Sequence, residues 1–413
     1  MLIKNAKIFT ITNGITTGDV LIEGNIIKKI GNCEAAIDDI SDEQIINANG
    51  KILMPGFINT HCHAVMYFMK GMGKGVPVKD WLKKVIIPIE DNYILEDFYI
   101  GTKRSCIDMI RNGITCFEDS YYNEKQIIHA AKEMKMRCCP SWSMIGPLKS
   151  GYINIEKAKP FYKKVEKTEL TRPCVSVHAP FTCSTETLKL GKTISDEKKC
   201  PLQIHVSENQ KEVEIILERE KLRPIEYLEK INFLSEKTIL THTIHINDNE
   251  IEIISRRKSK IAHCPASNIY LNSGTIKLKD ILDKKINVSL GTDAIASNEK
   301  LSIQHEMQTA RKIQNWEIPA ETLVKMATIN GAITLGLEKE IGSIEEGKKA
   351  DLIILNTQGS WEDILTAKVE TVICNGEVLL KNNKLIKVDE EKIIKEFKKA
   401  KDDLFKRADI SNE

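Results

Sequence analysis

Short apolar runs alternate with longer amphipathic segments through most of the chain. Between residues 55 and 342 the runs are separated by stretches rich in lysine and glutamate with helical spacing. This alternation is typical of repeated βα units around a parallel sheet. The runs that we count are "ILMPGFINTHCH", "GITCFEDS", "MRCCPSWS", "CVSVHAP", "LQIHVSE", "TILTHT", "KIAHCP" and "INVSLGTDA". Eight such units predict an α/β fold with a closed (β/α)8 barrel of the TIM type.

The two ends of the chain have a different pattern. Residues 1–54 and 343–388 contain short strand-like stretches separated by glycine and asparagine turns. Neither end has enough strands to form a good core alone. We therefore predict three parts: one small β-sandwich domain built from both segments, a barrel domain at 55–342, and a charged amphipathic helix at 389–413.

Composition excludes several classes of function. The 413 residues include 60 basic and 58 acidic side chains, so the net charge of +2 gives no general attraction to nucleic acid or to an anionic membrane. The opening "MLIKNAKIFT" lacks the apolar core of a signal peptide, and no apolar run reaches the length of a membrane span. The 11 cysteines are scattered without a Cys-x-x-Cys pair and are expected to be free thiols. We expect a cytoplasmic protein.

Residues that can carry chemistry gather at one end of the predicted strands. Seven of the nine histidines lie at or just beyond the carboxyl end of an apolar run. In a barrel of this type that end is the catalytic face, whereas structural histidines have no reason to prefer it. The pattern therefore favours an enzyme.

The first run carries two histidines that can share a metal ion. In "INTHCHAVM", His61 and His63 project from the same face of a strand. His205, which ends "LQIHVSE", can supply a third ligand across the barrel mouth. Asp293 in "SLGTDA" ends the eighth strand, which is next to the first in a closed barrel. Three imidazoles and a carboxylate suit zinc or ferrous iron better than magnesium, and they leave the ion enough positive charge to activate water.

A proton carrier follows the third proposed ligand. Glu208 lies three residues after His205 and would face the opposite way on a continuous strand, so the strand must end at about residue 206. A carboxyl turned over the mouth can move a proton between water and substrate, although a surface glutamate at the start of the next helix is the alternative. His242 is either a ligand or a hydrogen-bond partner of the water. His263 either orients its loop or touches substrate.

In this order, several segments resemble the amidohydrolase superfamily, and the match runs over almost the whole chain. They are "PGFINTHCHAVM", "HVSE", "LTHTIH", "HCPASN", "GTDAIASN" and "IEEGKKADLIIL". Within its aminohydrolase branch the chain most resembles the deaminases of 5′-methylthioadenosine, S-adenosylhomocysteine and 5′-deoxyadenosine. The resemblance implies a hydrolase of C–N bonds in cyclic amidines, which would convert an adenine nucleoside to its inosine analogue and ammonia.

The resemblance also implies a role for each residue of the site. It implies one metal ion per subunit, zinc or else iron, held by His61, His63, His205 and Asp293. Glu208 would protonate a ring nitrogen and His242 would orient the water. Asp293 would take the proton of the water and pass it to the departing amine.

Other positions are implied to face the substrate. "VPVKDWLKKVIIPIED" resembles the family segment whose tryptophan lines the pocket and whose glutamate holds the ribose hydroxyls, here Trp81 and Glu90. "VHAPFTCS" resembles the segment whose histidine contacts the nucleoside, here His178. Some members have arginines after the third strand, where this chain reads "PSWSMIGPLKSGYINIEK" with Trp142 and no arginine. We therefore expect small neutral 5′ groups to be accepted at least as well as charged ones.

Two alternatives stay open at this point. The substrate could be a free base such as guanine, or a triazine-like ring, but a substrate without ribose would leave Glu90 without its partner. The chain could also be a non-catalytic scaffold relative, although such a protein has no need to retain every ligand. We expect a homo-oligomer that binds a small molecule.

Overall fold

The barrel is formed by eight parallel strands. The computed structural model describes residues 1–33, 41, 44–72, 86–146 and 155–410. Within them the strands follow one another in chain order. They are β6 (Phe57–Cys62), β7 (Ile114–Tyr121), β8 (Arg137–Met144), β9 (Val175–Val177), β10 (Leu202–Val206), β11 (Thr238–His242), β12 (Lys260–His263) and β13 (Val288–Leu290). A parallel bridge from Cys62 to Asp293 joins the last strand segment to the first. The predicted (β/α)8 barrel is confirmed.

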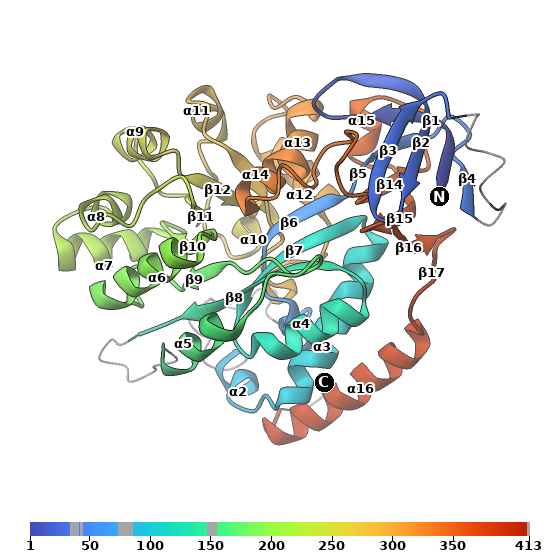
Figure 1. The fold of residues 1–413 in the computed structure, drawn as a ribbon. Coiled ribbons are helices and arrows are strands. Elements are labelled where there is room, and N and C mark those ends of the chain that lie inside the picture. Colours follow the sequence, from blue (N-terminus) through green and yellow to red (C-terminus); the bar gives the residue numbers. More distant parts are fainter. Residues whose placement is uncertain (34–40, 42–43, 73–85, 147–154, 411–413) are drawn as a thin grey trace.

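Helices cover the outside of the barrel (Figure 1). Those within the barrel segment are η3 (Ala64–Met69), α2 (Ile87–Glu90), α3 (Leu95–Arg111), α4 (Glu124–Glu133), α5 (Ile155–Lys164), α6 (Thr185–Lys198), α7 (Gln210–Glu220), α8 (Pro224–Lys230), α9 (Asp248–Arg257), α10 (Pro265–Tyr270), α11 (Leu278–Asp283), η5 (Ile295–Ser297), α12 (Ile303–Ile313), α13 (Ala320–Ala327) and α14 (Ile329–Leu335). Their apolar faces pack on the strands, whose residues are almost all buried.

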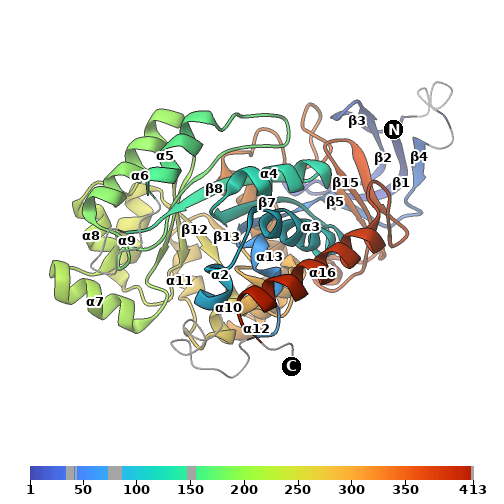
Figure 2. The ribbon, with the colours of Figure 1, turned by 90° about the horizontal axis from the view of Figure 1, so that it is seen from below.

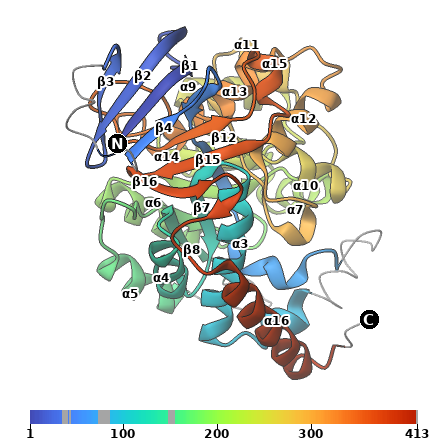
Figure 3. The same cartoon turned by 90° about the vertical axis from the view of Figure 1, so that its right-hand side faces the viewer.

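The two ends of the chain form one mixed sheet beside the barrel (Figure 3). In spatial order its strands are β17 (Lys384–Leu385), β16 (Glu377–Lys381), β15 (Val369–Cys374), β14 (Leu352–Leu355), β5 (Ile52–Pro55), β1 (Leu2–Phe9), β2 (Ile15–Glu23) and β3 (Ile26–Gly31), with β4 (Ile45–Asn47) paired to β1. The short helix α15 (Trp361–Ile364) lies between β14 and β15. Both ends of the chain thus build one small sheet domain, as the predicted fold class requires; we predicted a β-sandwich, and the described strands form one mixed sheet.

The first apolar run is divided between the two sheets. We predicted one strand over "ILMPGFINTHCH", but Ile52–Pro55 belongs to the mixed sheet and Phe57–Cys62 to the barrel. Gly56 joins them, and a Cβ at this position would collide with the side chain of Thr115. A glycine is therefore needed where the chain passes between the two sheets.

A buried ion pair links the barrel to the mixed sheet. The Arg137 guanidinium, at the start of β8, donates two hydrogen bonds of 3.0 Å to the carboxylate of Asp351. Their side chains are 0% and 2% exposed. Arg137 also donates to the carbonyl of Glu169, and Asp351 accepts from the peptide N–H of Asn375 at 2.8 Å. The pair therefore has hydrogen-bond partners from both domains.

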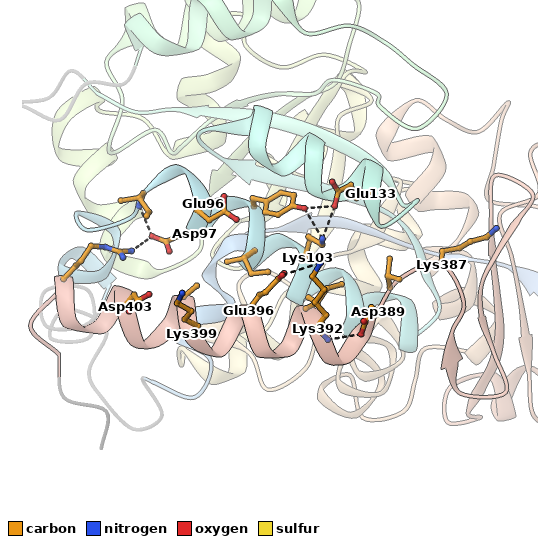
Figure 4. A pocket seen from close by; sticks show the side chains of 17 residues that line it. Glu96, Asp97, Lys103, Glu133, Lys387, Asp389, Lys392, Glu396, Lys399 and Asp403 are labelled. Carbon is orange, nitrogen blue, oxygen red and sulfur yellow. Dashed lines mark hydrogen bonds and ion pairs between the residues drawn. The ribbon is translucent and has the colours of Figure 1, made fainter.

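The C-terminal helix α16 (Glu390–Arg407) packs along α3 (Figure 2). The ring of Phe397 stacks on Phe68 with centroids 4.7 Å apart. A groove of about 810 Å³ opens between the two helices, and several of its charged side chains pair with each other (Figure 4). Lys103 lies 3.0 Å from Glu133 in this groove. None of the histidines described below lines it.

Two predictions from composition can be compared with the described residues. Among these residues, no helix combines the length and the apolar character that a membrane crossing requires. The 11 cysteines all lie in the described part of the chain and are free thiols.

Candidate metal centre and active site

Three imidazoles converge at the carboxyl end of the barrel. His61 and His63 come from the end of β6, and His205 comes from β10 on the other side. One ring nitrogen from each lies within 4.8 Å of the others, and the Nε2 atoms of His61 and His205 are 3.2 Å apart. The three residues that the sequence predicted as ligands are thus brought together.

Main-chain carbonyls fix the orientation of two of these rings. The Nδ1 atom of His63 lies 2.6 Å from the carbonyl oxygen of Ser120, and that of His205 lies 2.6 Å from the carbonyl oxygen of His178. A carbonyl can only accept, so each Nδ1 carries a proton, and in the neutral form of each ring Nε2 keeps its lone pair. The lone pairs therefore point to the centre of the cluster, which is the arrangement that a metal ligand needs.

The His61 ring is held by side chains instead. Its Nδ1 lies 3.1 Å from Nε2 of Gln203 and 3.8 Å from Oε2 of Glu118, and all three residues are fully buried. Burial raises the pKa of Glu118 to about 8, although hydrogen bonds from Ser141 and Ser120 oppose the shift. We did not identify Gln203 or Glu118 from the sequence. The signal was present for Gln203, because it lies two residues before His205 and so shares its strand face.

Asp293 completes the cluster. Its Oδ1 lies 3.6 Å from Nε2 of His61 and 3.3 Å from Nε2 of His63. Its Oδ2 accepts hydrogen bonds from Ser267 at 2.5 Å and Ser297 at 3.1 Å. Burial alone would raise its pKa, but the contacts with His61 and His63 reverse this and hold the pKa well below its usual range. The two serines lie within the quoted motifs "HCPASN" and "GTDAIASN", yet their role was not predicted.

Glu208 is turned over the mouth of the barrel. Strand β10 ends at Val206, as predicted, and Ser207 adopts a left-handed conformation with φ of 53°. The Glu208 carboxylate then lies 3.9 Å from Nε2 of His242 and accepts a long hydrogen bond of 3.4 Å from Ser273. Burial is the main reason that its pKa is raised to about 7, and the charge of Asp293 adds to the shift.

His242 lies beside the three rings but directs its Nε2 towards Glu208. Its own φ is 73°, and its Nδ1 lies 3.0 Å from the amide nitrogen of Asn268. Burial lowers its pKa to about 4. A neutral imidazole there can accept or donate a hydrogen bond, depending on its tautomer.

Glu90 and His178, which were also predicted from the sequence, lie beside the cluster of histidines. Glu90 ends α2, and its carboxylate accepts a hydrogen bond from the hydroxyl of Tyr121. The centroid of the Tyr121 ring is 6.0 Å from that of the His63 ring. The ring centroid of His178 lies 5.2 Å from that of His205. His178 also contacts the Thr182 hydroxyl through Nδ1, at 2.7 Å.

Two positions cannot be assigned a place in the cluster. Trp81 lies outside the described residues. His263 is fully buried on β12, and neither of its ring nitrogens has a hydrogen-bond partner among the described residues. Both of its alternative roles stay open.

Comparisons with known proteins agree with this geometry. The model of the "Amidohydrolase family" matches residues 52–379. The chain is 36% identical over 410 residues to the 5′-deoxyadenosine deaminase of Methanobrevibacter smithii, with 94% of each chain covered. It is 35% identical over 405 residues to the 5-methylthioadenosine/S-adenosylhomocysteine deaminase of Thermodesulfovibrio yellowstonii, with 92% of each covered.

A solved structure has the same fold. The adenosine deaminase from Xanthomonas campestris, crystallised with bound zinc, superposes with a TM-score of 0.91 at 23% identity and 98% coverage of both chains. At this identity the likeness concerns the fold, in which a barrel is combined with a small sheet domain.

Proposed function

The chain belongs to the amidohydrolase family, and on this premise we propose that it is a metal-dependent hydrolytic deaminase of adenine nucleosides. Its substrates are of the 5′-deoxyadenosine, 5′-methylthioadenosine and S-adenosylhomocysteine type, and its products are the inosine analogue and ammonia. The observation that carries the proposal is the convergence of three imidazoles and one carboxylate at the catalytic end of a barrel. Two relatives whose alignments cover over 90% of this chain are named as deaminases of such nucleosides.

The residues that would hold the metal ion are His61, His63, His205 and Asp293. The donor set supports zinc, with iron as the alternative, because imidazole nitrogen predominates over oxygen. One divalent ion per subunit, when bound, would lower the pKa of a water molecule enough to make it a nucleophile near neutral pH.

Glu208 is proposed as the general acid. With a pKa of about 7 it is protonated in a large fraction of molecules at neutral pH, as an acid in this role requires. It gives its proton to a ring nitrogen of adenine, which makes C6 more electrophilic. Water then adds to C6, and His242 orients that water by a hydrogen bond. Asp293 accepts one proton of the water and passes it to the amino group, so that the C6–N bond breaks and ammonia leaves. The proton that remains on the C6 hydroxyl returns to Glu208 as the C6=O bond forms, which restores the acid.

Glu90, His178 and Trp81 are proposed to hold the nucleoside. The partly buried carboxylate of Glu90 would accept hydrogen bonds from the ribose hydroxyls, each worth about 1.5 to 3 kcal/mol because the acceptor is charged. Residues 140–157 contain no arginine, which supports the acceptance of small neutral 5′ groups at least as well as charged ones. We further propose that the active protein is a homo-oligomer.

Ammonia release from a panel of compounds tests the proposal. The panel contains 5′-deoxyadenosine, 5′-methylthioadenosine, S-adenosylhomocysteine, 2′-deoxyadenosine, adenine and guanine. We expect the highest kcat/KM for nucleosides with an intact ribose and a small neutral 5′ group. Glu90→Gln should lower kcat/KM for the ribonucleosides by about tenfold or more and leave adenine little changed, since a charge-assisted bond of about 1.5 kcal/mol or more is weakened.

The matched control for this experiment is Glu96→Gln, because Glu96 is exposed on the neighbouring helix α3. A wild-type preference for a free base would favour the guanine- or triazine-type alternative. A protein that binds no transition metal under any growth condition would instead favour the non-catalytic scaffold.

A further inference from the structure

The turn that carries Glu208 is a strained piece of backbone. A regular continuation of β10 would direct Glu208 away from the cluster, and the left-handed Ser207 redirects it. Residues other than glycine are disfavoured in this conformation, so neighbouring groups must stabilise it. The Glu208 side chain supplies little of that support, because its contacts with Ser273 and His242 are 3.4 Å and 3.9 Å long.

The side chain of a second glutamate, Glu212, binds the peptide N–H groups of this turn. The Glu212 carboxylate is 2% exposed, and its two oxygens accept separate hydrogen bonds. Oε1 accepts from the N–H of Ser207 at 3.0 Å, and Oε2 accepts from the N–H of Glu208 at 2.9 Å. Asn209, which caps α7, accepts from the N–H of Glu212 at 3.0 Å and so fixes the start of the helix that carries it.

We propose that Glu212 is the positioning residue for proton transfer at Glu208. The inference rests on the proposed function, since it assigns Glu212 the task of aiming the general acid. Glu212 contacts the peptide groups of the turn and acts on the reaction only through them. His205 is held independently, because its Nδ1 is bonded to the carbonyl of His178 and its own N–H donates to the same oxygen at 3.0 Å. Loss of Glu212 should therefore misplace Glu208 while the metal ligands stay in place.

Glu212→Gln is the direct test. A glutamine can accept only one of the two hydrogen bonds and places an N–H against the other peptide N–H. We expect kcat for the adenine nucleoside to fall by about 10²-fold, the order of loss produced by a misplacement of 1 Å, while KM changes little. Zinc content and the zinc dissociation constant, measured by chelator competition, should equal those of the wild type.

A double-mutant cycle separates positioning from general structural damage. Wild type, Glu208→Gln, Glu212→Gln and the double variant are compared under the same conditions. Glu208→Gln removes the acid that Glu212 is proposed to position. In that background, the further fall in kcat caused by Glu212→Gln should therefore be less than about twofold. An equal loss in both backgrounds, or a loss of zinc affinity, would overturn the positioning role.

The cycle also distinguishes this inference from the proposed function. If Glu208→Gln alone retains wild-type turnover, the assignment of the general acid fails. If Glu208→Gln is impaired and Glu212→Gln is fully active, only the role of Glu212 fails. Glu218→Gln, an exposed glutamate on the same helix, is the matched control. Should Glu212→Gln not fold, Glu212→Asp, which withdraws the carboxylate by one methylene, takes its place in the cycle.

Discussion

The two ends of the barrel hold buried charge in opposite ways. At the amino end, Arg137 and Asp351 are joined by two hydrogen bonds of 3.0 Å, and their remaining groups bond to the main chain. At the carboxyl end, the Nε2 atoms of His63 and His205 face other groups of the cluster and have no carbonyl partner in the described part of the chain. Among the described residues, the contacts of the Glu208 side chain there are long, at 3.4 Å and 3.9 Å.

Residues with positive φ occur at both ends of the barrel, since Lys135, Lys199 and Lys258 precede β8, β10 and β12 at the amino end. At the carboxyl end Ser207, His242 and Asp293 all have positive φ values, of 53°, 73° and 56°. Each such residue costs about 1 to 3 kcal/mol and persists only where its surroundings determine it. The hydrogen bonds, and not the backbone, therefore distinguish the two ends: the amino end has its buried charges paired, while the carboxyl end keeps polar atoms available to ligands.

The largest expected effect is the loss of a metal ligand. His63→Ala should leave the barrel folded but remove most of the bound metal. Turnover should fall by at least about 10³-fold, because the metal contributes several kcal/mol to the transition state and each 1.4 kcal/mol is tenfold. Metal analysis and ammonia release measure the two effects. His129→Ala, on the exposed face of α4, is the control, and full metal occupancy in His63→Ala would contradict the ligand assignment.

A smaller effect of a different kind is expected at the amino end. Arg137→Met should lower the free energy of unfolding by about 3 to 5 kcal/mol, because it leaves the carboxylate of Asp351 buried and unpaired. The kcat and metal content of the folded protein should stay unchanged. Urea denaturation and ammonia release on the same sample check both statements.

Two further variants sharpen this test. Lys325→Met breaks an exposed pair with Glu321 and should cost less than about 1 kcal/mol. The double variant Arg137→Met with Asp351→Leu should regain most of the stability, since an apolar pair leaves no unpaired charge. If Arg137→Met lowered kcat but not stability, the proposed division between the two ends would be wrong.

The last expected effect concerns pH. Burial raises the pKa of Glu306 from 4.5 to about 8, although the N–H of Ala266 and the amide of Asn298 donate to its carboxylate. The folded state therefore keeps a proton that the unfolded chain releases above pH 4.5. The free energy of unfolding should accordingly fall as pH rises through this interval and level off above about 8. Urea denaturation across this range should show a shallower slope for Glu306→Gln than for the wild type; equal slopes would contradict the assignment.

Much of the fold was predictable because it depends on periodicity. Eight apolar runs gave the eight barrel strands, and polar residues at their ends marked the catalytic face. The division of the first run at Gly56 was not predicted, since it depends on the proximity of Thr115, which is distant in sequence. Local hydrophobicity does not indicate which of two sheets a strand joins.

The candidate site was predictable only in part. Residues that alternate along a strand, such as His61 and His63, can be read from spacing alone. Gln203 shares the strand face of His205 and could have been found in the same way. Ser267 and Glu212 contact the site through their position in three dimensions, and their residue types are common elsewhere in the chain. The roles proposed for Glu90 and His178 depend on resemblance and await the substrate experiments.

The mixed sheet has a consequence for how the protein is made. Strand β5 pairs with β1 on one side and with β14 on the other, so its second edge is completed by Leu352–Leu355. Because synthesis proceeds from the N-terminus, all eight barrel strands leave the ribosome before that edge can be covered. An unpaired strand edge is a site of aggregation. A chain that stops short of β14 would therefore leave this edge of β5 exposed and would be prone to aggregate, even where its barrel sequence is complete.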